Sequence, residues 1–199
     1  MTLYLVGTGL GGRGLSIEGL ELARKADVVL VDAYTSFVSQ EDLRELRSVL
    51  GREFKVVKRE ELEDGFEELV NMALREEVAL LVPGDPLIAT THVSLLVEVK
   101  RRGGRARVIH GATIVTAALG EAGLHIYKLG GVVTLTSEKE SLKTVYGVIK
   151  RNKSSRLHTL ILLQQDPSSG LVYPDEALSR LLDAEEEFKE GVIGPEDLV

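Results

Sequence analysis

Apolar and polar residues alternate with two different periods along the first half of the chain. Short runs rich in Val, Leu and Ile predict strands at Leu3–Val6, Asp27–Asp32, Phe54–Val57, Val78–Val82 and Arg107–Ile109. Between them, apolar residues at helical spacing predict helices over Ile17–Lys25, Gln40–Leu50, Glu68–Arg75 and Val93–Arg102. Because strands that alternate with amphipathic helices form βαβ crossovers, residues 1–110 are expected to form an α/β domain with a mainly parallel sheet.

The pattern changes after residue 110. Ala112–Gly120 is rich in small residues and predicts a tightly packed helix, and strands are expected at Val132–Thr136 and His158–Leu163. Helices are expected near Leu142–Lys150 and from Pro174 to Lys189, since proline suits the first turn of a helix. Residues 111–199 are therefore expected to form a second, smaller α/β domain.

Composition narrows the class of protein. With 44% hydrophobic residues and a formal charge of −7, from 24 Lys and Arg against 31 Asp and Glu, the chain is typical of a soluble globular protein. The absence of cysteine excludes disulfides, thiolate zinc sites and cysteine nucleophiles, and four scattered histidines argue against a metal site. The acidic balance and the lack of a long apolar run argue against nucleic-acid and membrane partners, so a cytoplasmic protein is expected.

The first candidate site is a glycine-rich turn after the first strand. Gly7, Gly9 and Gly12 match the G-x-G-x-x-G pattern, and Asp32 ends the next strand, where dinucleotide-binding proteins hold a ribose hydroxyl. However, the loop continues past these glycines, and Ser16 is the expected N-cap of a helix that begins late. Such a helix does not direct its N-terminal N–H groups at a phosphate. The turn is expected to approach a ligand other than NAD, or to connect strand and helix without any ligand.

The second candidate site is the segment Pro83–His92, which follows a buried strand. Two prolines and a glycine fix a sharp bend there, so Asp85 is held at the carboxyl end of a parallel strand. Open α/β sheets bind ligands at that edge. Asp85 could also hold its own turn or cap the following helix, and these roles are compatible. His92 is interpreted as a hydrogen-bonding residue at the start of a helix rather than as a catalyst.

Two further segments leave alternatives open. The small residues of His110–Gly120 let a ligand or another backbone come close, and Thr113 can cap the helix, although tight helix packing explains the segment equally well. The cations between Lys100 and Arg107 are typical of a solvated helix end, but they could also steer an acidic partner surface.

Together these segments resemble the diphthine synthase family, a branch of the tetrapyrrole-methylase-like superfamily. The residues that carry the resemblance are Leu3–Leu10, Tyr34–Ser36, Pro83–His92, Gly123–Gly130 and His158–Leu160. The strings Asp-Pro-x-x-Ala-Thr-Thr-His and Gly-Leu-x-x-Tyr-Lys are specific to this branch. The resemblance implies a two-domain α/β fold, with a mainly parallel sheet in the N-terminal domain and a mixed sheet in the C-terminal domain.

The resemblance also implies a homodimer that holds S-adenosylmethionine in the cleft between its domains. Carried over position by position, the cofactor contacts are Leu10, Asp85, Ile88, Thr113, Ile114 and Leu163. No catalytic residue is assigned, and the open candidates for accepting a proton are His92, His110, His125 and Tyr34. Asp197–Val199 is typical of the start of a strand, and the family continues beyond this point, so the C-terminal domain is expected to be incomplete.

The implied activity is methylation of the amino group of the 3-amino-3-carboxypropyl histidine on elongation factor 2, which gives diphthine in diphthamide biosynthesis. A sulfonium is already activated, so the enzyme mainly has to align the reacting atoms and exclude water. The alternatives are a C-methyltransferase acting on a precorrin-type tetrapyrrole, an NAD-binding oxidoreductase based on the glycine-rich turn and Asp32, and a non-catalytic dimerising module.

Overall fold

The computed structural model describes every residue except Phe37, Glu63, residues 167–169 and residues 198–199. The chain divides into two compact units, Met1–Ile114 and Val115–Val199, and each is described by itself. The strand expected to begin at Asp197 falls mostly on residues 198–199, outside the described residues.

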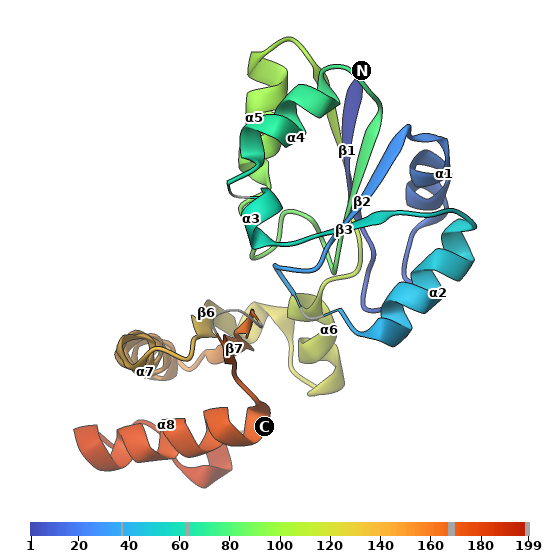
Figure 1. The fold of residues 1–199 in the computed structure, drawn as a ribbon. Coiled ribbons are helices and arrows are strands. Elements are labelled where there is room, and N and C mark those ends of the chain that lie inside the picture. The colour runs from blue at the N-terminus through green and yellow to red at the C-terminus, as the bar shows by residue number, and fades with distance from the viewer. Residues whose placement is uncertain (37, 63, 167–169, 198–199) are drawn as a thin grey trace. The chain divides into compact units, whose positions relative to one another are not determined.

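The first unit is built on a five-stranded sheet with strand order β3-β2-β4-β1-β5 (Figure 1). Its strands are β1 (Thr2–Gly7), β2 (Val28–Asp32), β3 (Lys55–Val57), β4 (Val78–Val82) and β5 (Arg105–Ile109). Every neighbouring pair is parallel, which confirms the predicted parallel sheet. Since β1 lies between β4 and β5, the carboxyl ends of these three strands are neighbours on one edge of the sheet.

Helices cover both faces of this sheet (Figure 1). One face is covered by α1 (Ile17–Lys25) and α2 (Gln40–Leu50), and the other by α3 (Arg59–Leu62), α4 (Phe66–Ala73) and α5 (Val93–Arg101). Along β4 the side chains alternate between the two cores: Leu81 packs on the α1 side and Leu80 on the α5 side. A strand buried on both faces reads as a continuous apolar run, which is why Val78–Val82 was recognisable in the sequence.

The ends of α1 are fixed by side chains. Ser16 accepts a hydrogen bond of 3.0 Å from the N–H of Gly19, so it is the N-cap that the sequence predicted. At the other end, the Arg52 guanidinium donates to the carbonyls of Ala23, Arg24 and Ala26 at 3.3, 3.0 and 2.6 Å. Because α1 runs antiparallel to the strands, Arg52 lies at the amino edge of the sheet, opposite the carboxyl ends.

The second unit begins within α6, whose first residue, Ile114, belongs to the first unit, and it contains two small sheets. Its elements are α6 (Ile114–Glu121), η1 (Ile126–Lys128), β6 (Leu129–Leu135), α7 (Lys139–Ser154), β7 (His158–Leu163), β8 (Gln165–Asp166), β9 (Gly170–Leu171), α8 (Pro174–Phe188) and η2 (Pro195–Asp197). β6 and β7 pair in parallel and β8 and β9 antiparallel, so both kinds of pairing occur, in separate sheets. The core contains Leu135, Val145 and Leu181. None of the helices in the described part of the chain combines the length and apolar character needed to cross a membrane.

Candidate functional site at the carboxyl edge of the first sheet

The loops after β1 and β4 are joined by backbone hydrogen bonds. The Thr8 N–H donates to the Val82 carbonyl at 2.8 Å. Gly9 and Gly84 then form an antiparallel bridge, in which the Gly9 N–H donates to the Gly84 carbonyl at 3.2 Å and the Gly84 N–H to the Gly9 carbonyl at 2.8 Å. The two loops therefore act as one backbone layer beyond the end of the sheet.

The loop after β5 packs against this layer without room for side chains. A Cβ at Gly7 would lie 2.5 Å from the Gly84 carbonyl oxygen and 2.6 Å from the Gly111 nitrogen. A Cβ at Gly111 would lie 2.4 Å from the same oxygen. These separations are too short for any side-chain carbon, so the junction of the three loops requires glycine at both positions.

Asp85 links the loops after β4 and β5, and its side chain is only 7% exposed. Its Oδ1 accepts from the Leu87 N–H at 2.9 Å, so the predicted role of holding its own turn is confirmed. Its Oδ2 lies 2.7 Å from His110 Nδ1 and accepts from the Gly111 N–H at 3.3 Å. The sequence did not predict this pairing with His110, because the two residues come from different loops.

Large apolar side chains are exposed after β1, β4 and β5. Leu10, Ile88 and Ile114 are 57%, 44% and 53% exposed. Thr113 lies half-buried beside Ile114, so the structure brings five of the six predicted contact residues to the same edge of the first unit. Leu163 ends β7 in the second unit, where it packs partly against that unit's core. Apolar side chains exposed beside a few fixed polar groups are typical of a small-molecule site.

Asp32 is fully buried and occupied by internal hydrogen bonds. Its Oδ1 accepts from the N–H groups of Tyr34 and Thr35 at 2.7 and 3.1 Å, and its Oδ2 from the Thr35 hydroxyl and from His92 Nε2, the latter at 2.8 Å. Burial tends to raise the pKa of Asp32, but the hydrogen bonds from His92 and Thr35 outweigh it and lower the pKa below its ordinary value. Asp32 is therefore not available to a ribose hydroxyl, which removes the acidic residue of the oxidoreductase alternative.

The rest of the glycine-rich loop packs against α2. A Cβ at Gly12 would lie 2.4 Å from the Asp42 carbonyl oxygen, and Arg13 forms an ion pair of 2.9 Å with Glu45. The third glycine of the pattern is thus explained by packing against a helix rather than by a bound pyrophosphate.

The four candidate proton acceptors have different surroundings. His92 is buried against Asp32 at the first turn of α5, as the sequence predicted for a hydrogen-bonding residue. His110 is 70% exposed at the carboxyl edge and bonded to Asp85. His125 stacks on Tyr127 in the second unit, and Tyr34 lies under the guanidinium of Arg59. Of these four, only His110 combines an exposed ring with a position on the edge where the three loops meet.

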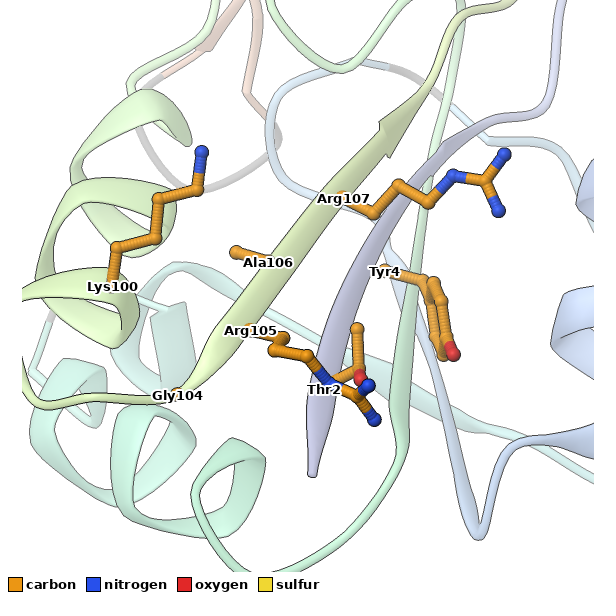
Figure 2. A pocket seen from close by; sticks show the side chains of 7 residues that line it. All are labelled: Thr2, Tyr4, Lys100, Gly104, Arg105, Ala106 and Arg107. Carbon is orange, nitrogen blue, oxygen red and sulfur yellow. The ribbon is translucent and has the colours of Figure 1, made fainter.

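A hollow lined by basic residues lies at the other end of β5 (Figure 2). It is lined by Thr2, Tyr4, Lys100, Gly104, Arg105, Ala106 and Arg107. Arg105 lies 3.8 Å from Glu77, Arg107 pairs with Glu18, and Glu98 pairs with both Arg101 and Arg102. Most of the charge of this cluster is paired with acidic side chains of the described residues, and the cluster lies toward the amino edge of the sheet, so a role in steering a partner stays a prediction.

Three comparisons place this fold and site among known proteins. The family model of the Tetrapyrrole (Corrin/Porphyrin) Methylases matches residues 2–193. Diphthine synthase of Methanopyrus kandleri is 39% identical over 98% of this chain and 75% of its own length, and that of Methanothermobacter thermautotrophicus is 38% identical with the same coverage. Diphthine methyl ester synthase 2 of Candida albicans is 37% identical over 81% of this chain and 54% of its own length. A crystal structure of diphthine synthase superposes with a TM-score of 0.85 at 35% identity, covering 96% of this chain and 74% of that one.

The fold and site define an α/β enzyme with an open parallel sheet and loops gathered at its carboxyl edge. The chain belongs to the tetrapyrrole methylase family, among its diphthine synthases. It is therefore a methyltransferase of diphthamide biosynthesis, as the sequence resemblance predicted.

Proposed function

We propose that this methyltransferase takes its methyl group from S-adenosylmethionine and transfers it to the amino group of the 3-amino-3-carboxypropyl histidine on elongation factor 2, as a homodimer. The observation that carries the proposal is the meeting of three loops at one sheet edge, where Leu10, Ile88 and Ile114 are exposed beside Asp85. The names of the relatives support diphthine as the product.

The residues at this edge fit S-adenosylmethionine better than a phosphate-containing cofactor. S-adenosylmethionine has no phosphate, and the Ser16 hydroxyl already accepts from the Gly19 N–H in the first turn of α1, where a phosphate would bind. The exposed side chains of Leu10, Ile88 and Ile114 provide apolar surface for an adenosyl group. Thr113 and Leu163 complete the proposed set of contacts, and Asp85 holds the loops that carry Ile88 and Thr113.

Methyl transfer from a sulfonium requires no covalent participation of the protein's own side chains. When bound, S-adenosylmethionine would supply a methyl group activated by its sulfonium: the amine lone pair would form the new N–C bond while the S–C electron pair leaves with the sulfur of S-adenosylhomocysteine, and the methylated ammonium would release its proton to solvent. The attacking amine must be neutral, and no enzyme nucleophile is required. The hydrogen-bonded loops at the carboxyl edge then serve to hold the methyl donor in line with the amine, which is where most of the rate enhancement is expected.

The direct test incubates labelled S-adenosylmethionine and the protein with three acceptors. These are elongation factor 2 that carries the 3-amino-3-carboxypropyl histidine, the unmodified factor, and a precorrin. We expect label only in the pre-modified factor. Label in the precorrin would favour the tetrapyrrole alternative, and equal label in the unmodified factor would mean that the acceptor is wrong.

Analysis of the labelled product and a comparison of two variants make this test more specific. Since one relative is named a methyl ester synthase, mild base should be used to separate ester-bound label, released as methanol, from label on nitrogen. Ile88→Ser should reduce transfer because it removes an exposed apolar group from the proposed site. Val97→Ser, at a 60% exposed position on α5, is the matched control and should not.

A further inference from the structure

A buried hydrogen bond connects the segment Pro83–His92, which carries part of the family resemblance, to the end of β2. Asp32, at the end of β2, and His92, the N-cap of α5, are separated by 60 residues and joined by a contact of 2.8 Å. The two side chains are 0% and 3% exposed. A buried carboxylate is costly unless it is fully hydrogen-bonded, so the pair has to be explained.

The hydrogen bonds of Asp32 show that it serves the protein itself rather than a ligand. A carboxylate offers about four acceptor positions. Asp32 uses four of them for the N–H groups of Tyr34 and Thr35, the Thr35 hydroxyl and His92. It therefore fastens the segment that ends at His92 to the turn that follows β2.

The segment Pro83–His92 is held at both ends and is strained between them. At its start, Asp85 accepts from the N–H of Leu87, and the Asp85 carbonyl accepts from Ile88 at 3.2 Å. Near its end, the Thr90 hydroxyl donates to the Pro86 carbonyl at 2.6 Å. Between these bonds Ala89 has φ = 57°, a left-handed conformation that is unfavourable for alanine. Such a conformation persists only where the surroundings impose it, and it sits next to the exposed Ile88.

We infer that Asp32 and His92 are positioning residues that fix this loop in the conformation presenting Ile88 to the methyl donor. The inference rests on the proposed function, which assigns Ile88 to the cofactor site. Without the His92 anchor, Ala89 can relax toward a more favourable conformation, and Ile88 then moves. Neither residue touches the reacting atoms, so the loss is expected in binding of the donor rather than in the transfer step.

Three variants test this inference. His92→Leu removes the donor to Asp32 while keeping an apolar side chain in the buried position, and His92→Gln keeps a donor near the position of Nε2. Arg52→Ala is the matched control, because it removes several hydrogen bonds in the same unit but at the opposite edge of the sheet. If His92→Leu does not fold, Thr35→Val removes the hydroxyl that donates to the same oxygen of Asp32.

Two measurements apply to each variant. Amide hydrogen exchange in the ligand-free protein reports on the loop directly through the bonded N–H groups of Leu87 and Ile88. Titration with S-adenosylhomocysteine and steady-state kinetics report on binding. We expect His92→Leu to speed exchange at these amides and weaken binding by about tenfold, raising KM for the donor with kcat little changed, and His92→Gln to restore most of both.

The outcomes separate this inference from the function on which it rests. If the parent protein does not bind S-adenosylhomocysteine, the proposed cofactor is wrong, and the exchange data still decide whether the pair holds the loop. If the parent binds and His92→Leu binds equally well, or if Arg52→Ala weakens binding just as much, the positioning role is overturned. A fall in kcat at unchanged KM would also contradict it.

Discussion

At the scale of single residues, Asp85 shows how one side chain can serve both the fold and the site. Its carboxylate holds its own turn through Leu87 and the neighbouring loop through His110 and Gly111. The loops that it joins are those that expose Ile88 and Ile114. Removing it should therefore affect the ligand-free protein as well as the complex.

We expect Asp85→Ala to lower the free energy of unfolding of the ligand-free protein by about 1–3 kcal/mol, because buried donors lose their acceptor. S-adenosylhomocysteine at 100 times its Kd should stabilise the parent by about 2.7 kcal/mol, and the variant should lose most of that gain. Denaturant unfolding with and without the ligand measures both. Glu98→Ala, which removes a carboxylate from the far end of α5, is the control. An equal gain in variant and parent would mean that Asp85 holds the loops without influencing the cofactor.

The position of Asp85 could be predicted, but its partner could not. The run Val78–Val82 followed by Pro-Gly-Asp-Pro indicates a rigid corner at a strand end, and the structure has that corner. His110 is 25 residues away, and His92 is 60 residues from Asp32. Such pairs depend on strand order, which local propensity does not determine.

At the scale of elements, local patterns predicted the longer helices and strands, several of them with shifted ends, and missed the short elements α3, β8 and β9. α1, α2, β4 and β7 have the predicted bounds, because each combines a clear apolar period with a cap or turn signal. β6 begins at Leu129 rather than at Val132, and includes Gly130 and Gly131. The reason is tertiary: the side chain of Asn152 on α7 packs over these glycines and donates to the Gly131 carbonyl at 3.3 Å.

This packing makes Gly130→Ala a sharp test of the second unit. The new Cβ would lie 2.6 Å from Cγ of the buried Asn152, so we expect a loss of about 1–3 kcal/mol in the free energy of unfolding. The same change should cost less in an Asn152→Ala background, since the clash is then relieved. Gly147→Ala in α7 meets no atom within 4 Å and should stabilise the helix by up to about 1 kcal/mol. Additive losses in the double variant would contradict the proposed clash.

Glu185 on α8 fastens the segment that follows this helix. It accepts from the N–H groups of Gly191, Val192 and Ile193 at 2.6, 2.8 and 2.8 Å and from the Tyr146 hydroxyl at 2.8 Å. Burial tends to raise the pKa of Glu185, but the N–H group of Ile193, the Tyr146 hydroxyl and the other two N–H groups outweigh it and lower the pKa to about 2. The folded state therefore favours the ionised form of the Glu185 carboxylate.

A pKa lowered on folding contributes stability that is fully present above the unfolded value and is lost as the pH falls. For Glu185 that window extends from its ordinary value of 4.5 down to about 2. We expect the urea concentration at which the second unit is half unfolded to fall as the pH is lowered through this window. Hydrogen exchange of the backbone amides of that unit measures this midpoint. Glu185→Gln should be less stable at pH 7 and show a flatter acid dependence. Glu186→Gln, an exposed neighbour, should follow the parent curve, and an unchanged acid dependence in Glu185→Gln would contradict the assignment.

At the scale of the whole molecule, the candidate site depends on where strand ends meet. The sequence predicted that the loops after three strands gather at one edge of the sheet, because Gly7, Pro83–His92 and the segment after Ile109 each follow a predicted strand, and the structure has them there. The spacing of the glycines alone did not distinguish a loop that binds a ligand without phosphate from a dinucleotide-binding loop. That distinction needed the burial of Asp32 and the contact of Gly12 with α2, both of which depend on how distant elements pack.

The same distinction can be measured on the intact protein with two ligands. We expect S-adenosylhomocysteine at 100 times its Kd to raise the free energy of unfolding by about 2.7 kcal/mol, and NADH at matched concentration to have no effect. The reason is that Asp32 already holds four donors, Ser16 caps α1 and Gly12 packs on α2, so the residues that match the dinucleotide pattern are used within the fold. Gly12→Ala should lower stability equally with and without S-adenosylhomocysteine, because its new Cβ meets the Asp42 carbonyl rather than the ligand. Stabilisation by NADH that disappears in this variant would restore the dinucleotide interpretation and remove the basis for a methyl donor at this edge.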